Sequence, residues 1–201
     1  MSKTETEIYG LFFEVMPKPG HEKHYFEHVE RLKPALANHT GLLWLQRYKD
    51  ADQANLILSH QLWDGESSLA NWRHDRDHRK SQIAGMTKHF ADYRIRVGRR
   101  IWDFDQGTEN GTLPVEGDLQ FVLTVHGAAP AETAAFAGLG TMHRRFINVI
   151  EPTRAVLLIS LDHVPTNLCD QIKSSQYDAA ALFEVSRDYG MFDRNAAPKA
   201  K

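Results

Sequence analysis

The sequence predicts an α+β protein made of two βαββαβ units in tandem. Strand-like and helix-like apolar patterns alternate in that order over residues 8–102, and a weaker version of the same order occupies 119–192. A polar segment with Gly and Pro, at 105–117, separates them. Four antiparallel strands with two helices on one face are the ferredoxin-like arrangement. We therefore expect domains at 1–104 and 118–201 with a linker at 105–117.

The first unit has the clearer pattern. Aromatic and β-branched residues gather in its expected strands, and apolar residues recur every three or four positions in its expected helices. On a helical wheel the second helix has one buried stripe, formed by Leu69, Trp72, Ile83, Met86 and Phe90. The expected strands are 8–16, 42–49, 55–63 and 93–102, and the expected helices are 21–38 and one that begins near Glu66.

The second unit is more divergent. Its first helix contains Gly138 and Gly140, which weaken helix formation. The expected strands are 119–127, a weaker one at 146–151, 154–164 and 181–192, and the expected helices are 130–146 and 166–178. Both faces of the first unit's strands are apolar, so its open sheet face needs a cover, and the second unit could supply one. Pairing within one chain and pairing between the chains of a homodimer both stay open.

Composition limits the classes of function. The net charge is −2, and neither half of the chain is strongly basic, which does not favour nucleic acid or an anionic membrane as partner. A single cysteine, Cys169, excludes an intrachain disulfide and is expected to be a buried structural thiol. The N-terminal residues lack the apolar core of a signal peptide, and no apolar run approaches the ~20 residues that span a bilayer. We expect a soluble, cytoplasmic protein.

Three stretches of the first half carry a family resemblance: Leu42-x-Trp44, the AxWRxxxxHR run at 70–79 and FADYRIRV at 90–97. Together with the element order, they resemble the antibiotic biosynthesis monooxygenase (ABM) family over residues 8–104. RDYGMFDR at 187–194 is a fainter echo in the second half. The resemblance implies an α+β barrel in which a second copy covers the open sheet face. It also implies oxidation of a small aromatic or quinone-type molecule by oxygen without a cofactor.

The same region holds the candidate site residues. A histidine can move protons near neutral pH, an arginine can stabilise an enolate or phenolate, and a tryptophan can stack on a planar substrate. We expect His78, His89 and Arg94 to be catalytic, and Trp72, His60, His74 and Arg96 to bind the substrate, in a cavity between the sheet and the helix that bears Trp72.

Structural roles compete with each assignment. Trp72 falls at a core position, and Asp75 and Arg79 have the spacing of a solvated ion pair. Arg94 and Arg96 alternate with apolar residues, as on a strand with one wet face. His60 lies in an apolar strand, either as a polar group facing a cavity or as a hydrogen-bonded core histidine. If these roles prevail, the chain is a non-catalytic small-molecule-binding or dimerisation module of the same fold.

Metal and haem sites are not predicted. His21, His24 and His28 have helical spacing, but the sequence has no HExxH motif and no cysteine pair, so a solvated start of a helix is the expected role. Haem-degrading members of the superfamily use an Asn on the first strand and a His on the second helix. Phe13 and Gln82 stand at those positions here, so haem degradation is the less favoured activity.

Overall fold

The computed structural model describes residues 7–114, 119–129, 136, 138–175 and 177–198. By its contacts the chain divides into two units. Unit 1 comprises residues 1–46, 55–97 and 187–201, and unit 2 comprises residues 47–54 and 98–186. This grouping by contacts differs from the expected domains at 1–104 and 118–201. Whether those two segments fold separately is still a prediction. None of the described helices is long and apolar enough to cross a lipid bilayer.

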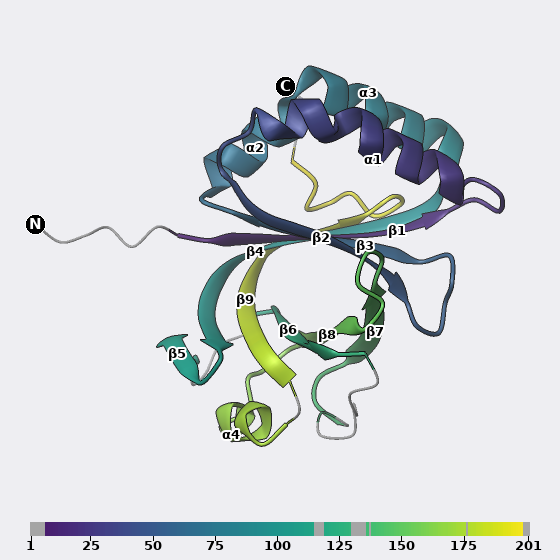
Figure 1. Cartoon of the computed structure of the whole chain (residues 1–201). Coiled ribbons are helices and arrows are strands. Elements are labelled where there is room, and N and C mark those ends of the chain that lie inside the picture. The colour runs from purple at the N-terminus through teal and green to yellow at the C-terminus, as the bar shows by residue number, and fades with distance from the viewer. Residues whose placement is uncertain (1–6, 115–118, 130–135, 137, 176, 199–201) are drawn as a thin grey trace, which may run out of the picture. The chain divides into compact units, whose positions relative to one another are not determined.

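Unit 1 is a sheet with its helices on one face (Figure 1). The sheet order is β2-β3-β1-β4-β9, to which β2, β4 and β9 contribute only part of their length. The bounds are β1 Tyr9–Pro17, α1 Glu22–Ala37, β2 Leu42–Asp50, β3 Ile57–Trp63, α2 Glu66–His74, α3 Arg76–Ala84, a π-helical turn η1 Gly85–His89, β4 Phe90–Asp105 and β9 Tyr177–Gly190. β1 and β3 pair antiparallel, from Tyr9 opposite Trp63 to Val15 opposite Ile57.

The helical face of unit 1 buries two apolar clusters. The first joins Val15 and Ile57 on the sheet to Tyr25 on α1 and Tyr93 on β4. The second consists of Trp63, Leu69, Trp72 and Val97. Successive strand residues point to opposite faces of a sheet. Since Phe13 and Val15 face the helices, Phe12 and Glu14 face the other way.

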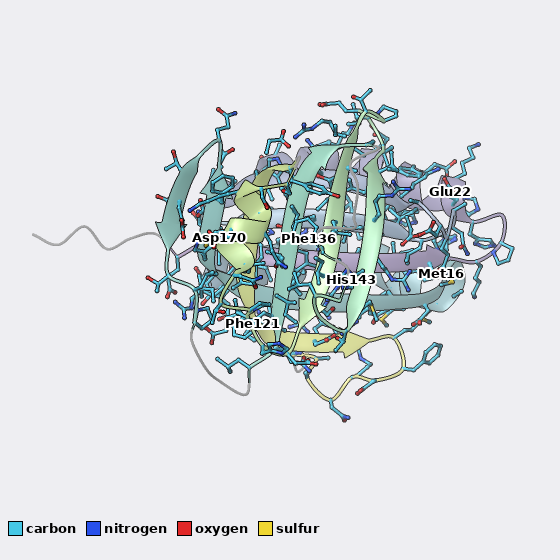
Figure 2. All side chains as sticks on the ribbon, turned by 90° about the horizontal axis from the view of Figure 1, so that it is seen from below. Met16, Glu22, Phe121, Phe136, His143 and Asp170 are labelled. Carbon is cyan, nitrogen blue, oxygen red and sulfur yellow. The ribbon has the colours of Figure 1, made fainter. Side chains whose placement is uncertain are left out.

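Unit 2 contains β6 between β8 and β9, with β7 next to β8. Figure 2 draws the side chains on these strands, with Phe121 on β6 and His143 on β7. Val125 and Leu157 lie directly opposite each other in the β6–β8 pairing and belong to the core of this unit. The bounds are β5 Thr108–Gly111, β6 Phe121–Ala128, β7 Met142–Asn148, β8 Arg154–Leu161 and α4 Leu168–Lys173.

The α+β class and the tandem ferredoxin-like order are confirmed, with local corrections. Most of the predicted helix at 130–146 lies outside the described residues, but its last part is wrong, because residues 142–148 form β7. Gly138 and Gly140 have φ of +82° and +74°, a conformation that ends helices. The weak strand predicted at 146–151 therefore begins earlier. Within the expected linker, β5 pairs with the end of β4, while residues 115–117 lie outside the described residues.

Candidate functional site

The helix that bears Trp72 is interrupted at Asp75. Its backbone is extended, with ψ of 136°, and its carboxylate accepts hydrogen bonds at 2.9 Å from the backbone N–H groups of Asp77 and His78. An aspartate in this position is an N-cap, so α3 starts as a new helix. The prediction of one continuous buried stripe was wrong for this reason. Ile83 and Met86 are 56% and 39% exposed.

The same cap replaces the expected ion pair. Arg79 donates its backbone N–H to the carbonyl of Asp75, but the two side chains form no ion pair in the described structure. The Asp75 carboxylate lies 3.5 Å from His39 Nε2 instead. Backbone bonds to His78, followed by this contact with His39, lower the pKa of Asp75 below its usual value.

Trp72 and His78 form the centre of the helix junction. Their rings stack at 4.0 Å with an interplanar angle of 10°. The His39 ring packs edge-on against Trp72 at 5.1 Å. Trp72 is only 4% exposed and belongs to the second apolar cluster. His78 therefore occupies one face of the Trp72 ring, and a planar substrate cannot stack on that face.

The hydrogen bonds of His78 assign its tautomer. Nδ1 lies 2.9 Å from the carbonyl oxygen of Trp72, which can only accept, so Nδ1 carries the proton. Gln82 Nε2, 3.1 Å from the same Nδ1, donates to the carbonyl oxygen of Arg73 at 3.2 Å. Among the described residues, none bonds to Nε2 of His78. That nitrogen keeps its lone pair and can accept a proton.

Burial lowers the pKa of His78 from 6.5 to about 4, although the carbonyl of Trp72 and the charge of Asp75 act in the opposite direction. Removing the ring from water disfavours the imidazolium form. The imidazole is therefore neutral throughout the physiological range. A neutral ring of known tautomer is ready to accept a proton, but at this pKa it is a weak base.

We expect the free energy of unfolding to fall as the pH is lowered from 6.5 to 4. Burial lowers the pKa of both His78 and His126 to about 4, so in this window the unfolded chain binds more protons than the folded one. Each histidine contributes stability above pH 6.5 that is lost as the pH falls through about 4, with an upper limit of about 3 kcal/mol each. Urea denaturation at a series of pH values measures the slope. His78→Gln should reduce the slope by the contribution of one buried histidine, whereas a slope unchanged in that variant would contradict the assignment.

Three other predicted residues lie on the sheet face opposite the helices. The His60 ring stacks on Phe12 at 4.6 Å and packs edge-on against Trp44 at 4.9 Å. It is 2% exposed. Arg96 pairs with Glu14 at 2.6 Å, and both side chains are buried. Burial lowers the pKa of Arg96, while Glu14 opposes the change. This face thus combines aromatic rings with a buried ion pair.

Arg94 is on the same face and forms a bidentate pair with Asp188. Its Nε and Nη2 atoms donate to the two carboxylate oxygens at 2.9 and 2.5 Å. The hydrogen bond to Asp188 raises the pKa of Arg94 above its ordinary value. The guanidinium keeps its charge but is already partly neutralised by a carboxylate, which weakens its field on any developing oxyanion.

The last two predicted residues lie elsewhere in unit 1. His74, at the end of α2, is exposed. His89 ends η1, and its Nδ1 lies 3.0 Å from Nδ1 of His21. Burial, and then the neighbouring His24 and His21, lower the pKa of His89. The structure thus brings Trp72 together with His78, and His60 to the same face as Arg94 and Arg96, but it does not gather all seven residues at one point.

The residues at the haem-contact positions are engaged in packing or in hydrogen bonds. Phe13 packs against Phe90 and Tyr93, with ring centroids 6.0 and 5.9 Å apart. Gln82 holds the junction between α2 and α3 through Arg73. Cys169 was expected to be a buried thiol, but the structure shows it only partly buried. Burial, and then the neighbouring Glu109, raise the pKa of its thiol to about 11, which makes the thiol a poor nucleophile.

The sequence alone did not reveal the role of His39. This residue follows α1, and 36 positions separate it from Asp75. No local motif connects two residues at that distance, so only the packing of α1 beside the helix junction brings them together. Gln82 is different, because its place four residues after His78 on a helix predicts that the two side chains meet.

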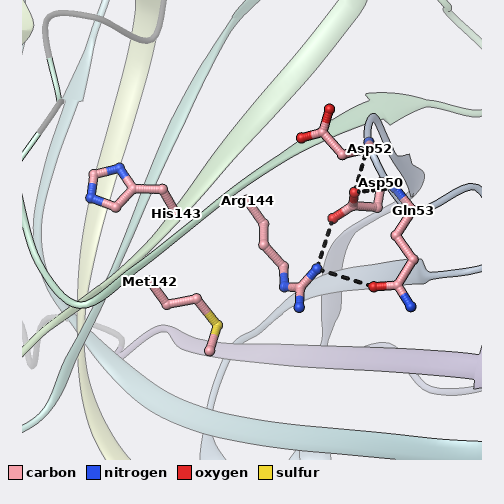
Figure 3. Close-up of a pocket in the computed structure, with 6 residues that line it drawn as sticks. All are labelled: Asp50, Asp52, Gln53, Met142, His143 and Arg144. Atoms are coloured by element: carbon pink, nitrogen blue, oxygen red, sulfur yellow. Dashed lines mark hydrogen bonds and ion pairs between the residues drawn. The ribbon is translucent and has the colours of Figure 1, made fainter.

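An open hollow of about 320 Å³ lies in unit 2 and includes none of the predicted residues. Figure 3 shows Asp50 and Arg144 beside it. The Asp50 carboxylate accepts from the backbone N–H groups of Asp52 and Gln53 at 2.9 and 2.8 Å and from Arg144 at 3.3 Å. The hydrogen bonds that the Asp50 carboxylate accepts from Asp52 and Gln53 stabilise the turn after β2. The remaining lining residues are Met142 and His143.

Comparison with known proteins adds to this geometry. Residues 8–82, which run from β1 into α3 and include Trp72 and His78, match the family model described as antibiotic biosynthesis monooxygenase. This region is similar to the ABM family. The resemblance seen in the sequence is thereby confirmed, and the stacked pair lies inside the matched residues.

Similar proteins differ in how much of this chain they match. A Pyricularia oryzae protein named jasmonate monooxygenase ABM is 27% identical over 96% of this chain and 97% of its own length. YqjZ of Bacillus subtilis is 27% identical over 49% of this chain and 85% of its own. Among solved structures, an anthrone oxidase-like protein is 10% identical with a TM-score of 0.44, covering 99% of each chain.

Proposed function

We propose that this protein is a monooxygenase that oxidises a small aromatic or quinone-type molecule without a cofactor. The match to the ABM family model and the Pyricularia oryzae relative named as a monooxygenase support the reaction class. The observation that supports a role for particular residues is the fixed tautomer of His78, whose Nε2 keeps an available lone pair. The cytoplasmic location and the homodimer expected from the sequence remain predictions.

The weak basicity of His78 constrains the substrate. A base with a pKa of about 4 removes protons effectively only from a substrate whose anion is strongly stabilised. Conjugated hydroquinones and phenolic ketones meet this condition, because their negative charge spreads over several oxygens and rings. A simple ketone is a much weaker acid. The low pKa therefore favours the aromatic or quinone-type class.

The reaction can proceed with the substrate itself as reductant. In a substrate with an acidic CH2 group, such as an anthrone, His78 Nε2 takes a proton from carbon, and the resulting carbanion transfers electrons to O2 to form a C–O bond as a peroxide. Loss of the second hydrogen from carbon breaks the O–O bond, which leaves one oxygen atom as a carbonyl on the substrate and the other in water. A CH2 group and O2 thus become C=O and H2O. The protein supplies the base and a site shielded from water.

His78→Gln is expected to lower the turnover number by about a hundredfold or more, the scale of general acid–base catalysis. Glutamine is similar in size and polarity, but it cannot accept a proton. The measurement is oxygen consumption with a panel of hydroquinones and anthrones, with incorporation of 18O from labelled O2 into the product. His163→Gln, at an exposed position in unit 2, is the matched control and should keep full activity.

Two variants on the opposite sheet face separate the alternatives. If His60→Gln or Arg94→Ala abolishes turnover while His78→Gln retains it, the reaction takes place on that face and the proposed role of His78 is wrong. If none of the panel is oxidised but compounds bind, the chain is a non-catalytic binding module. The jasmonate monooxygenase relative supports a second substrate class, so jasmonic acid belongs in the same panel.

A further inference from the structure

Three histidines from two separate segments of unit 1 converge. His21 precedes α1, His24 lies in its first turn, and His89 ends the π-helical turn η1. One ring nitrogen of each lies within 4.8 Å of the other two, and Nδ1 of His21 and Nδ1 of His89 are 3.0 Å apart. All three side chains are half-buried. The spacing at the start of α1 brings His21 and His24 together, and the fold adds His89 from η1.

These separations suit a metal ion. Imidazole nitrogens bind Zn²⁺ at about 2.0–2.1 Å with tetrahedral angles, which places two ligand nitrogens about 3.3 Å from each other. The 3.0 Å separation of the two Nδ1 atoms is close to this value, and the 4.8 Å limit for the set requires only a small rotation of a ring. Three histidines leave a fourth position for water.

The backbone holds the ligands in place. The N–H of Lys18 donates to the carbonyl oxygen of His89 at 2.9 Å, and the N–H of His21 donates to the carbonyl of Lys18 at the same distance. The π-helical turn that presents His89 also depends on Gly85, where a Cβ atom would lie 2.3 Å from the Phe90 ring. Single π-helical turns occur frequently at functional sites.

A carboxylate supports one of the ligands. Nδ1 of His24 lies 3.2 Å from Oε2 of Glu27, which leaves Nε2 available for a metal. Histidine ligands usually donate their second N–H to a carboxylate in this way, which fixes the ring and increases its basicity. His28 is a neighbour and not a ligand, because its Nδ1 bonds to Ser81 Oγ at 3.0 Å and contacts Arg31.

We propose that His21, His24 and His89 form a binding site for a divalent transition-metal ion, with zinc as the first candidate and water as the fourth ligand. Bound metal would link the start of α1 to the end of η1. The site contains none of the residues of the Trp72–His78 pair, so it is independent of the proposed oxidation chemistry. An experiment that contradicts the metal site would therefore leave the proposed oxidation untouched, and the reverse also holds.

The test uses the full chain without a histidine tag, titrated with ZnCl2 in competition with a chromogenic chelator. We expect one equivalent of zinc to bind. His89→Gln and His24→Gln should each weaken the binding at least tenfold, and Glu27→Gln should weaken it by about 10–100-fold, the usual effect of losing such a carboxylate. His163→Gln should bind zinc as the unaltered protein does.

Two further measurements make the result decisive. Cobalt substitution should give the intense visible absorption of a four-coordinate site, and zinc should raise the Tm of the unaltered protein but not that of His89→Gln. Zinc affinity that is the same in His89→Gln, or more than one equivalent of weakly bound zinc in every variant, would overturn the proposal. The three histidines would then be a solvated cluster at the start of a helix.

Discussion

Arg96→Met is expected to lower the free energy of unfolding by about 3–5 kcal/mol. The substitution keeps an unbranched side chain of similar length but removes the positive charge that lies 2.6 Å from Glu14. Glu14 is 5% exposed, so its carboxylate would remain buried without that charge. Urea denaturation monitored by tryptophan fluorescence gives the free energy.

The matched control is Arg99→Met on the same strand. Arg99 pairs with Glu184 at 3.0 Å, but its side chain is 44% exposed, so water screens the charges. We expect a loss of less than about 1 kcal/mol. The double variant Glu14→Leu, Arg96→Met should recover most of the stability, because no isolated charge stays in the core. Equal losses for Arg96→Met and Arg99→Met would contradict this account.

Trp72→Ala is expected to cost about 3–5 kcal/mol of stability, the usual range for deleting a buried tryptophan. The side chain is 4% exposed and packs with Trp63, Leu69 and Val97. Because the ring also stacks on His78, its loss should hydrate His78 and raise the pKa of that imidazole toward 6.5. Denaturation measures the first effect, and NMR titration of the His78 ring measures the second.

Trp72→Phe separates packing from proton chemistry. A phenyl ring retains part of the stacked surface, so this variant should lose less stability than Trp72→Ala and keep the pKa of His78 well below 6.5. If the pKa of His78 remains near 4 in Trp72→Ala, the stacked ring is not what keeps water from the imidazole, and the proposed base is shielded by other groups.

The sequence predicted the first repeat well, because local patterns determine it. The apolar and aromatic content of β1 and β3 and the apolar spacing of α1 correspond to residues that are buried or partly buried in the structure. The break at Asp75 was missed, although an aspartate before a polar run is an N-cap signal, because the apolar spacing across it also fitted one helix. Gly138 and Gly140 correctly indicated a weak helix but not the strand that replaces its end.

The sequence did not predict which residues far apart along the chain meet in the fold. Glu14 and Arg96 are 82 positions apart, and His21 and His89 are 68 apart. Each pair depends on strand register and on the place where a helix ends, and these boundaries are the least certain part of a pattern-based prediction. The residue types predicted that His89 and Arg96 are site residues. They did not predict that His21 and Glu14 are the partners of these two residues.

The division of the chain into units has a consequence for its biosynthesis. Residues 187–201 group with unit 1, yet the ribosome makes them after all of unit 2. Asp188, which binds Arg94, and the carbonyl of Pro198, which accepts a bond from Arg73 at 2.7 Å, are made only after unit 2. Unit 1 therefore completes its contacts only after all of unit 2 has been synthesised. A nascent chain stalled before Arg187 would hold Arg94 without Asp188.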